Sequence, residues 1–435
     1  MKIIKLAWES VKNIFQLKKQ PLWIRWVFSM YIFTALFAPF IANKAPLFMI
    51  KEGNWYFPAF QNSAYVIIQE NGKEIAVLKE AVNWHAIKNE FQLFAPIPYD
   101  PSSSDLINYN YVSPFAQQYT ESEKPPSELK PLSWRNRHWL GTTKTGADVL
   151  AGLVHSTRLS LLIGFFSMFI ASVIGICIGS LAGFFGDKLL KVNRRSLILS
   201  LILVVPAGFY IFVFPENNLE LPETESIPAY FSFLKVLLFL FIIALPFTMK
   251  INKSKKDSPQ TLWTIPIDSF ISRGIELFVS VPRLILIITL AAISRPSAMS
   301  LVLILGFTAW TSIARMVRAE FIRLKNMGFM ESAISLGLSN FRQIIYHLLP
   351  NAIVTVRVGI IFGIAGAILT EAGLSFLGIG LYPDTVSWGS MMAAGREQFS
   401  AWWLIIFPGI SIAILLIMLN RIADENHYVP QEKPL

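Results

Sequence analysis

Residues 159–186 read LSLLIGFFSMFIASVIGICIGSLAGFFG, and this stretch contains no Asp, Glu, Lys or Arg. A helix that crosses a bilayer needs about 20 consecutive, predominantly apolar residues. The stretch exceeds that length, so the sequence predicts a membrane-spanning helix here. The rest of the chain agrees, since 54% of its residues are hydrophobic and only 15% are charged, whereas soluble domains carry about 25% charged residues.

Seven further stretches with few or no charges are long enough to span a membrane. We therefore predict an all-α polytopic membrane protein with about eight membrane-spanning helices. The first span follows a basic segment and is not followed by a clear signal-peptide cleavage site, so we expect a retained helix. The eight expected spans are 26–43, 159–186, 196–215, 229–249, 275–294, 296–314, 353–370 and 398–420.

The charges of the connecting segments predict the orientation of the spans. Segments 1–25, 187–195, 250–274 and 315–350 carry an excess of Lys and Arg, whereas 216–228 carries four Glu and no base. Cytoplasmic loops of membrane proteins are enriched in Lys and Arg. Both termini are therefore expected in the cytoplasm, and the net charge of +10 is explained without a nucleic-acid partner.

Two of the expected spans carry small residues at every fourth position. Small residues on one face of a helix let helix backbones approach closely in a membrane, so these rows predict a packed bundle. The rows are Gly175, Gly179 and Gly183 in one span, and Gly359, Gly363 and Ala367 in the other.

Residues 44–157 form the one long hydrophilic region, which this orientation places outside the cytoplasm. Asn71-Gly72 lies between two strand-like runs, which is a strong hairpin signal. We expect a small β-containing insertion without a catalytic cluster. Its aromatic residues Trp55–Phe60 leave two interpretations open, a peptide-contacting surface or the core of the insertion. His85 and His138 are expected to be plain surface or packing residues.

The sixth and seventh spans are joined by a loop with more structure than a connector needs. Residues 328–337 read as a short helix that ends at Gly337, because glycine is favoured just past a helix end. Ser339 or Asn340 can cap a second helix, 341–349. This second helix is expected to stop at Pro350.

The first of these short helices has an apolar face formed by Met330, Ala333 and Ile334. A short helix with such a face suits docking into a groove on a cytoplasmic partner. The alternative is a helix that lies on the membrane surface.

The same loop resembles a known family motif. Glu331-Ser332-Ala333, then Gly337, and then Leu349-Pro350 look like the EAA motif of ABC importer permeases, with Ser332 and His347 as departures. The resemblance implies that the helix around Glu331–Gly337 is a coupling helix that docks on an ATPase. The residues that it assigns to coupling are Glu331, Ser332, Ala333, Gly337, His347, Leu349 and Pro350.

Further motifs are similar to the peptide-permease branch of that family. His138-Trp-Leu-Gly-Thr142 with Gly146-Ala-Asp148-Val-Leu150 looks like the segment before the second span, although Thr143 and Ala147 replace the usual Asp and Arg. Glu371–Gly380 (EAGLSFLGIG) and Ser387-Trp-Gly389 look like the signature after the seventh span. The segment 44–137, with Trp55-Tyr-Phe-Pro58 and Phe94-Ala-Pro-Ile-Pro98, further resembles the permease of the microcin C and oligopeptide branch.

The resemblance implies a type I ABC importer transmembrane fold of six core helices, plus an inserted two-helix hairpin for which we see no family counterpart. The expected organisation is a cytoplasmic segment 1–25, a first helix 26–43, an extracytoplasmic segment 44–157, a second helix 158–186, the inserted hairpin 187–267, the permease core 268–420 with the coupling loop 315–350, and a cytoplasmic tail 421–435.

The resemblance also implies the function, that of a permease subunit of an ATP-driven importer of di- or oligopeptides in the cytoplasmic membrane. Its expected partners are a second permease subunit in a heterodimer, two cytoplasmic ABC ATPase subunits, an extracytoplasmic substrate-binding protein and the lipid bilayer. The sequence contains no G-x-x-x-x-G-K-[ST] loop, so ATP hydrolysis is expected from separate subunits. No cofactor and no metal site are expected.

Glu371, Gly373 and Ser375 are the candidate pore or gating residues, and a structural hydrogen-bonding role is the alternative for Glu371. Three other functions are weighed against the peptide importer. An importer of nickel or another small solute would belong to the same family. A self-energised carrier or channel should show internal repeats or acid/base relays within the membrane, and we find neither. A membrane-anchored enzyme would need a nucleophile and a base, and no such set is evident.

Overall fold

The computed structural model describes residues 20–60, 65–70, 73–78, 84, 91–121, 129–187, 191–193, 262–264 and 266–425. The chain divides into two compact units. The larger unit is formed by Met1–Ser180 together with Ile275–Leu435, and the smaller by Leu181–Gly274. In the described part of the smaller unit, β8 (Lys191–Asn193) pairs antiparallel with β9 (Leu262–Thr264).

Long apolar helices dominate the described residues. Five of them are long and apolar enough to cross a membrane, and the number rises to six if one bent pair counts as a single span. They correspond to the six spans expected outside the inserted hairpin, whereas the expected spans 196–215 and 229–249 lie outside the described residues. The helices are α2 (Leu22–Ile41), α3 (Val149–Phe185), the bent pair α6 (Ile267–Ser280) and α7 (Arg283–Ile293), α8 (Ala298–Lys325), α11 (Leu349–Phe376) and α13 (Trp403–Glu425).

Helix α3 begins at Val149, well before the expected start of its span at residue 158 or 159. The charge-free stretch marks only the most apolar part of the helix. The helix starts earlier because Asp148 caps it, with Asp148 Oδ2 accepting a 2.7 Å hydrogen bond from the backbone N–H of Ala151. The first turns contain the polar residues His155 and Arg158, so they lie outside the charge-free stretch from which the span was predicted.

The expected span 275–294 is not one straight helix. α6 ends at Ser280, α7 begins at Arg283, and the two are bent by 76°. Pro282 accounts for the break, because proline lacks a backbone N–H and disfavours the helical conformation of the preceding residue.

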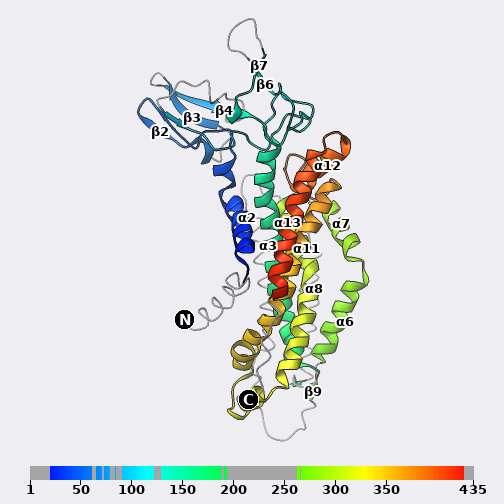
Figure 1. Ribbon diagram of the computed structural model, residues 1–435. Coiled ribbons are helices and arrows are strands. Elements are labelled where there is room, and N and C mark those ends of the chain that lie inside the picture. Colours follow the sequence, from blue (N-terminus) through cyan, green and yellow to red (C-terminus); the bar gives the residue numbers. More distant parts are fainter. Residues whose placement is uncertain are drawn as a thin grey trace, which may run out of the picture. The chain divides into compact units, whose positions relative to one another are not determined.

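Helix α11 lies at the centre of the larger unit, in contact with α8, α12 (Trp388–Glu397) and α13 (Figure 1). The main apolar cluster draws buried residues from α3, α7, α8 and α11. The glycine row of α3 lies against α8, since a Cβ atom on Gly179 would come within 2.5 Å of the carbonyl oxygen of Ala314. The close helix packing predicted from this row is therefore confirmed.

Helix α2 is attached to this bundle by a polar contact with α13, in which the Tyr31 hydroxyl donates a 2.9 Å hydrogen bond to the carbonyl oxygen of Ser411. Most of its large side chains are exposed, among them Trp26, Phe33 and Leu36. This apolar surface is suited to a membrane environment.

The strands β1 to β7 lie at one end of the long helices, within residues 42–148, which we call the strand segment (Figure 1). Its largest sheet has the antiparallel order β2-β1-β5. β3 and β4 pair with Glu70 opposite Lys73, which confirms the hairpin predicted around Asn71-Gly72. The strands are β1 (Phe48–Lys51), β2 (Asn54–Tyr56), β3 (Tyr65–Glu70), β4 (Lys73–Leu78), β5 (Phe91–Leu93), and the ribbon of β6 (Tyr119–Glu121) and β7 (Leu129–Pro131).

The core of the strand segment contains Met49, Val66 and Trp84, with Tyr56 packed against them. Trp55, Phe57 and Phe60 are exposed. The interpretation of the aromatic residues 55–60 as core is therefore wrong for these three residues. His85 lies outside the described residues.

Candidate functional site

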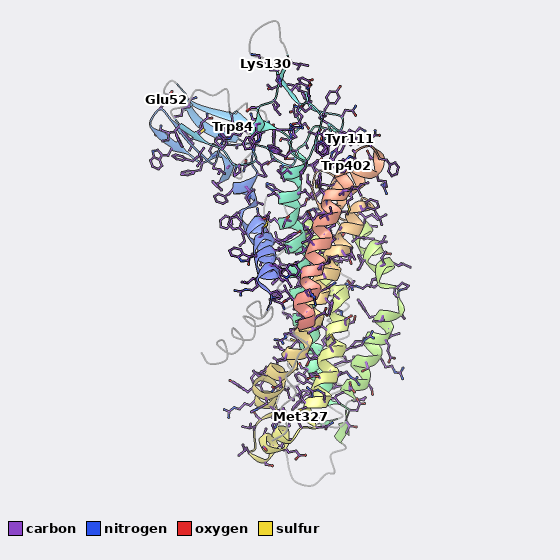
Figure 2. All side chains as sticks on the ribbon, viewed as in Figure 1. Glu52, Trp84, Tyr111, Lys130, Met327 and Trp402 are labelled. Carbon is purple, nitrogen blue, oxygen red and sulfur yellow. The ribbon has the colours of Figure 1, made fainter. Side chains whose placement is uncertain are left out.

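Helix α9 (Gly328–Ser335) lies between α8 and α11, at the other end of the long helices from the strand segment (Figure 2, where Met327 marks its start). It closes with a Schellman motif, in which the N–H of Gly337 donates to the carbonyl of Ile334 at 2.9 Å and the N–H of Leu338 donates to that of Ala333 at 3.2 Å. Gly337 has a φ of +68°, a left-handed conformation that suits glycine. The predicted short helix ending at Gly337 is confirmed.

The exposed surface of α9 differs from the predicted apolar face. Met330 and Ala333 are buried against the chain itself, so they are not available to a partner. Other apolar side chains of this loop are exposed, and we call them the α9 patch. They are Phe329, Ile334, Leu336 and Phe341, with exposed fractions of 38%, 56%, 79% and 67%.

Glu331 and Ser332 are exposed on the same short helix. The Ser332 hydroxyl donates a 3.2 Å hydrogen bond back to the carbonyl of Gly328. The other three residues of the motif, His347, Leu349 and Pro350, are half-buried in the helical segment that follows. The motif is therefore divided between the exposed helix α9 and the partly buried helical segment that follows it.

The chain does not stop being helical at Pro350. After α10 (Asn340–Arg342) it passes through a π-helical turn, Gln343–Leu348, and continues directly into α11. The predicted stop is therefore wrong. Pro350 lies in the first turn of α11, where the missing N–H of proline is tolerated. A π-helical turn inside a helix often accompanies a functional site.

Glu320 connects the two helices that lead into and out of the α9 loop. It is a buried residue of α8 and forms an ion pair with Arg323, one turn further along α8. The Thr355 hydroxyl of α11 donates to Glu320 Oε1 at 3.3 Å. This contact, which the sequence did not predict, joins the two helices close to the loop.

Glu371 is completely buried in α11. It accepts a 2.8 Å hydrogen bond from the Ser160 hydroxyl of α3 and a 3.0 Å hydrogen bond from the Ser375 hydroxyl. Of the three candidate pore residues, the structure brings Glu371 and Ser375 together and places Gly373 on an exposed face of α11. A Cβ atom on Gly389 would come within 2.2 Å of the carbonyl of Ala372, so α12 packs tightly beside this cluster.

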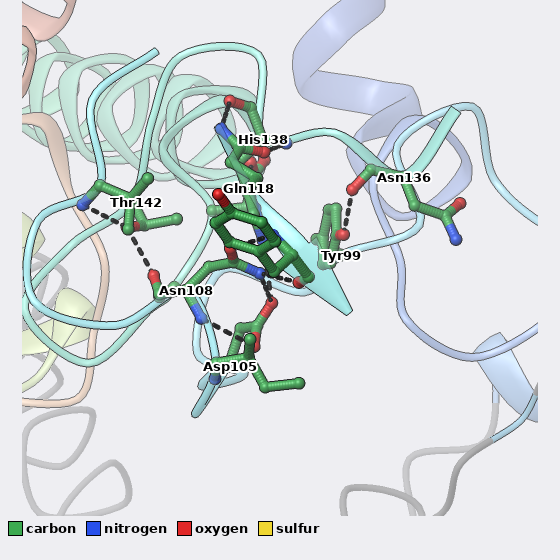
Figure 3. A network of polar contacts seen from close by, with 12 residues as sticks. Tyr99, Asp105, Asn108, Gln118, Asn136, His138 and Thr142 are labelled. Carbon is green, nitrogen blue, oxygen red and sulfur yellow. Dashed lines mark hydrogen bonds and ion pairs between the residues drawn. The ribbon is translucent and has the colours of Figure 1, made fainter. Parts of the chain in front are cut away.

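A second polar cluster lies where the strand segment meets α3 (Figure 3). His138 is completely buried, with its Nδ1 3.0 Å from Asp148 Oδ1 and its Nε2 3.3 Å from Asp105 Oδ2. Its ring stacks on Tyr99, with 4.1 Å between the ring centres. His138 is therefore not a surface residue but a packing residue with two carboxylate partners. Asp105 lies 33 positions earlier in the chain, and no local pattern pointed to it.

The two carboxylates control the protonation of this cluster. Burial alone lowers the pKa of His138, but the hydrogen bonds to Asp105 and Asp148 outweigh burial and the pKa is raised. Burial raises the pKa of Asp105, yet the hydrogen bonds from His138 and Asn108 lower it overall to about 2. The hydrogen bonds to the two carboxylates therefore favour the protonated form of His138. Within the described residues, no group of three or more His, Cys, Asp and Glu side chains is arranged to hold a metal ion.

The remaining residues of the His138–Leu150 motif connect three parts of the chain. The Thr142 hydroxyl donates to the carbonyl of Asn108 at 2.8 Å and accepts from the N–H of Val112 at 3.0 Å. The indole N–H of Trp403, at the start of α13, donates to the Thr142 carbonyl at 3.1 Å. The motif thus joins the loop 105–118, the start of α3 and the start of α13.

Residues 263–425, which contain the α9 loop and Glu371, match the family described as binding-protein-dependent transport system inner membrane component. This part of the chain is similar to that permease family. The chain is similar over nearly its whole length to the inner membrane ABC transporter permease protein YejE of Escherichia coli (strain K12). The two are 26% identical over 415 residues, which is 94% of this chain and 92% of that protein.

Two other relatives carry similar names. The peptidoglycan transport system permease protein YejE of Agrobacterium fabrum is 24% identical over 433 residues, 97% of this chain and 90% of that protein. The dipeptide transport system permease protein DppC of Alkalihalophilus pseudofirmus is 26% identical over 324 residues, 73% of this chain and 80% of that protein. The strand segment lies outside the residues that match the family, but both YejE proteins match nearly the whole chain.

Proposed function

We propose that the chain is the permease subunit of an ATP-driven importer that moves di- or oligopeptides across the cytoplasmic membrane. The similarity to proteins named as dipeptide and peptidoglycan transport permeases supports this substrate class. The observation that carries the proposal is the α9 patch, because exposed apolar side chains on a short helix indicate a protein partner. That partner is a cytoplasmic ATPase subunit.

The orientation follows from the loop charges. Lys and Arg are concentrated in 1–25, 187–195, 250–274 and 315–350, which places both termini and the α9 loop in the cytoplasm. The strand segment is then extracytoplasmic, on the side from which a substrate-binding protein delivers the peptide. The two spans expected from the sequence within 187–267 are compatible with this orientation, because an even number of spans returns the chain to the same side.

The complete transporter contains this chain, a second permease subunit, two ATPase subunits and the binding protein. ATP-driven closure of the ATPase subunits moves α9, and α8 and α11 carry that movement into the membrane. The contact between Glu320 and Thr355 keeps these two helices together near α9, so that they move as a unit. The hydrogen bond from Ser160 to Glu371 holds α11 against α3 at the other end of the helix.

Co-purification tests this proposal. The tagged chain, expressed with its neighbouring genes and extracted in mild detergent, should bring down a second permease and ATP-binding subunits. In proteoliposomes, the assembled complex should accumulate a labelled tripeptide only with ATP and the binding protein. Uptake of nickel in place of peptide would support the alternative solute class. Isolation as a lone homomer that transports without ATP would contradict the proposal.

A further inference from the structure

The sheet β2-β1-β5 has one face made only of apolar side chains. Ile50 stands opposite Trp55 on β2 and Phe91 on β5, and Phe48 stands opposite Leu93. Paired residues of neighbouring strands lie on the same face, and Phe48 and Ile50 share a face because side chains alternate along a strand. We call these five residues the aromatic face.

The opposite face of the same sheet is turned toward the core, although it contains polar residues. Met49 is buried in that core, and Lys51, two residues later, is also buried. Gln92, which pairs with Met49, belongs to this face as well. A sheet with one solvated face usually places apolar residues inward and polar residues outward. Here the outward face has no polar residue, so ordinary solvation does not explain it.

The aromatic face is exposed and its rings pack on one another. Trp55 is 70% exposed, and Phe91 is 50% exposed. The Phe48 ring is the centre of the cluster, with ring centres 5.3 Å from Trp55, 5.4 Å from Phe57 and 6.1 Å from Phe91. Apolar patches of this kind on a protein surface mark a contact with a partner or a membrane.

A row of rings on the membrane helix α2 leads to the segment 57–60, in which Phe57 packs on Phe48 of the aromatic face. Phe33, Phe37 and Phe40 follow one another in α2, with ring centres 4.6 Å and 5.8 Å apart. Phe40 lies 4.7 Å from Phe60, just past β2. β1 follows soon after the end of α2 at Ile41, so the sheet is tied closely to the end of the span (Figures 1 and 2).

We infer that the aromatic face lies in the interfacial layer of the membrane and contacts lipid. The exposed surface of α2 needs an apolar environment, and the aromatic row leads from that surface to the sheet. Trp and Tyr concentrate at the membrane–water interface, where an apolar ring body and a polar edge are both accommodated, and Trp55 is the most exposed residue of this face. Apart from the indole N–H of Trp55, the side chains of this face offer no hydrogen-bonding group. Protein interfaces carry roughly one hydrogen bond per 100–200 Å², so a protein partner fits this face less well.

Lipid-attached quenchers test the inference in the assembled transporter. Cys177, the single cysteine, is first changed to Ala. A fluorescent label is then attached to Trp55→Cys or Phe91→Cys, and to Lys130→Cys as control. Lys130 is exposed on β7, on the side of the strand segment away from α2 (Figure 2). Each labelled complex is placed in phosphatidylcholine nanodiscs that contain lipids with a nitroxide on the acyl chain near the headgroup.

Lipid nitroxide should quench the labels at 55 and 91 roughly twofold more than the label at 130, whereas aqueous iodide should show the reverse order. Two positions are used so that one poorly folded variant does not decide the outcome. Equal lipid quenching at all three positions would overturn the inference. Protection of the labels at 55 and 91 from both quenchers would also overturn it, because a protein chain would then cover the face. Neither outcome depends on the transported substrate.

Discussion

The Ser160 hydroxyl donates a 2.8 Å hydrogen bond to Glu371, a residue 211 positions away. The contact joins α3 to α11 inside the membrane-spanning bundle. Both residues are completely buried, so water cannot take the place of either partner if the hydrogen bond is lost. A buried polar group that loses its partner costs about 1–3 kcal/mol.

Replacing Glu371 by Ala should therefore lower the unfolding temperature of the purified complex, with a loss of about 1–3 kcal/mol. Glu371→Gln keeps an acceptor for the serine hydroxyls and should retain most of the stability and the uptake. Gly366→Ala, also in α11, is the matched control, since a Cβ atom there meets nothing within 4 Å. If Glu371→Gln stays stable but abolishes uptake, Glu371 has a role in the pore and not only in packing.

The α9 patch should control ATPase binding. Leu336→Glu places a charge on the most exposed residue of the patch, and the amount of co-purified ATPase should fall by roughly tenfold, because a charge buried in an apolar interface is costly. Ser335→Ala alters an exposed neighbour on the same helix and should leave the amount unchanged. Normal ATPase recovery with Leu336→Glu would mean that the patch contacts something else.

Gly337 and Glu331 should be needed to couple ATP hydrolysis to uptake, because the motif assigns both residues to coupling. Gly337→Ala forces a side chain into a left-handed conformation, which costs about 1 kcal/mol and should shift the end of α9. Variants at both positions should insert into the membrane and retain some ATP hydrolysis but lose coupled uptake. Uptake at the wild-type rate in both variants would contradict the coupling role.

Thr355 should matter for coupling through its hydroxyl. Thr355→Val keeps the shape of the side chain and removes the 3.3 Å hydrogen bond to Glu320. We expect a stability loss of about 0.5–1.5 kcal/mol and a lower ratio of peptide transported to ATP hydrolysed. Thr355→Ser keeps the hydroxyl and should preserve the ratio. A similar ratio in both variants would show that the contact is structural only.

The cluster at His138 should make the stability of the chain depend on pH. Because the folded-state pKa of His138 is raised above 6.5, its contribution is complete below pH 6.5 and is lost as the pH rises through the folded-state value. Because the pKa of Asp105 is lowered from 3.8 to about 2, its contribution is present above pH 3.8 and is lost toward pH 2. The unfolding temperature should therefore be highest between these limits and fall on either side. His138→Asn should remove the decline on the alkaline side, and an unchanged profile would show that the histidine does not titrate there.

The hydrophobic stretches predicted six of the helices because an uncharged run of this length rarely occurs outside a membrane-spanning helix. Their ends were less predictable. The start of α3 depends on Asp148 as a cap, and the polar residues His155 and Arg158 in its first turns hide the helix from a hydropathy search. Pro350 suggested a stop, but a proline in the first turn of α11 is compatible with a helix that continues.

The candidate site could also be predicted only in part, because part of it depends on contacts with other parts of the chain. The motif around Glu331 and Gly337 predicted α9 and its end, but which apolar residues face outward depends on what packs against them. Met330 and Ile334 look equivalent in the sequence, yet Met330 is buried and Ile334 is exposed. Contacts such as Asp105 with His138, and Thr355 with Glu320, join residues distant in the chain, so local patterns do not contain them.

The carboxylate of Asp148 stabilises two parts of the chain at the same time. One carboxylate oxygen holds the first turn of α3 and the other holds His138, and through His138 the loop at Asp105. Nucleating a helix is unfavourable until its first turn is fixed, so the first turn of α3 and the closure of this loop should form and open as one cooperative unit. In native-state hydrogen exchange, the amides of Ala151 and Asn108 should then exchange with the same opening free energy. The first turn of the membrane helix would report directly on whether the loop beside it is closed.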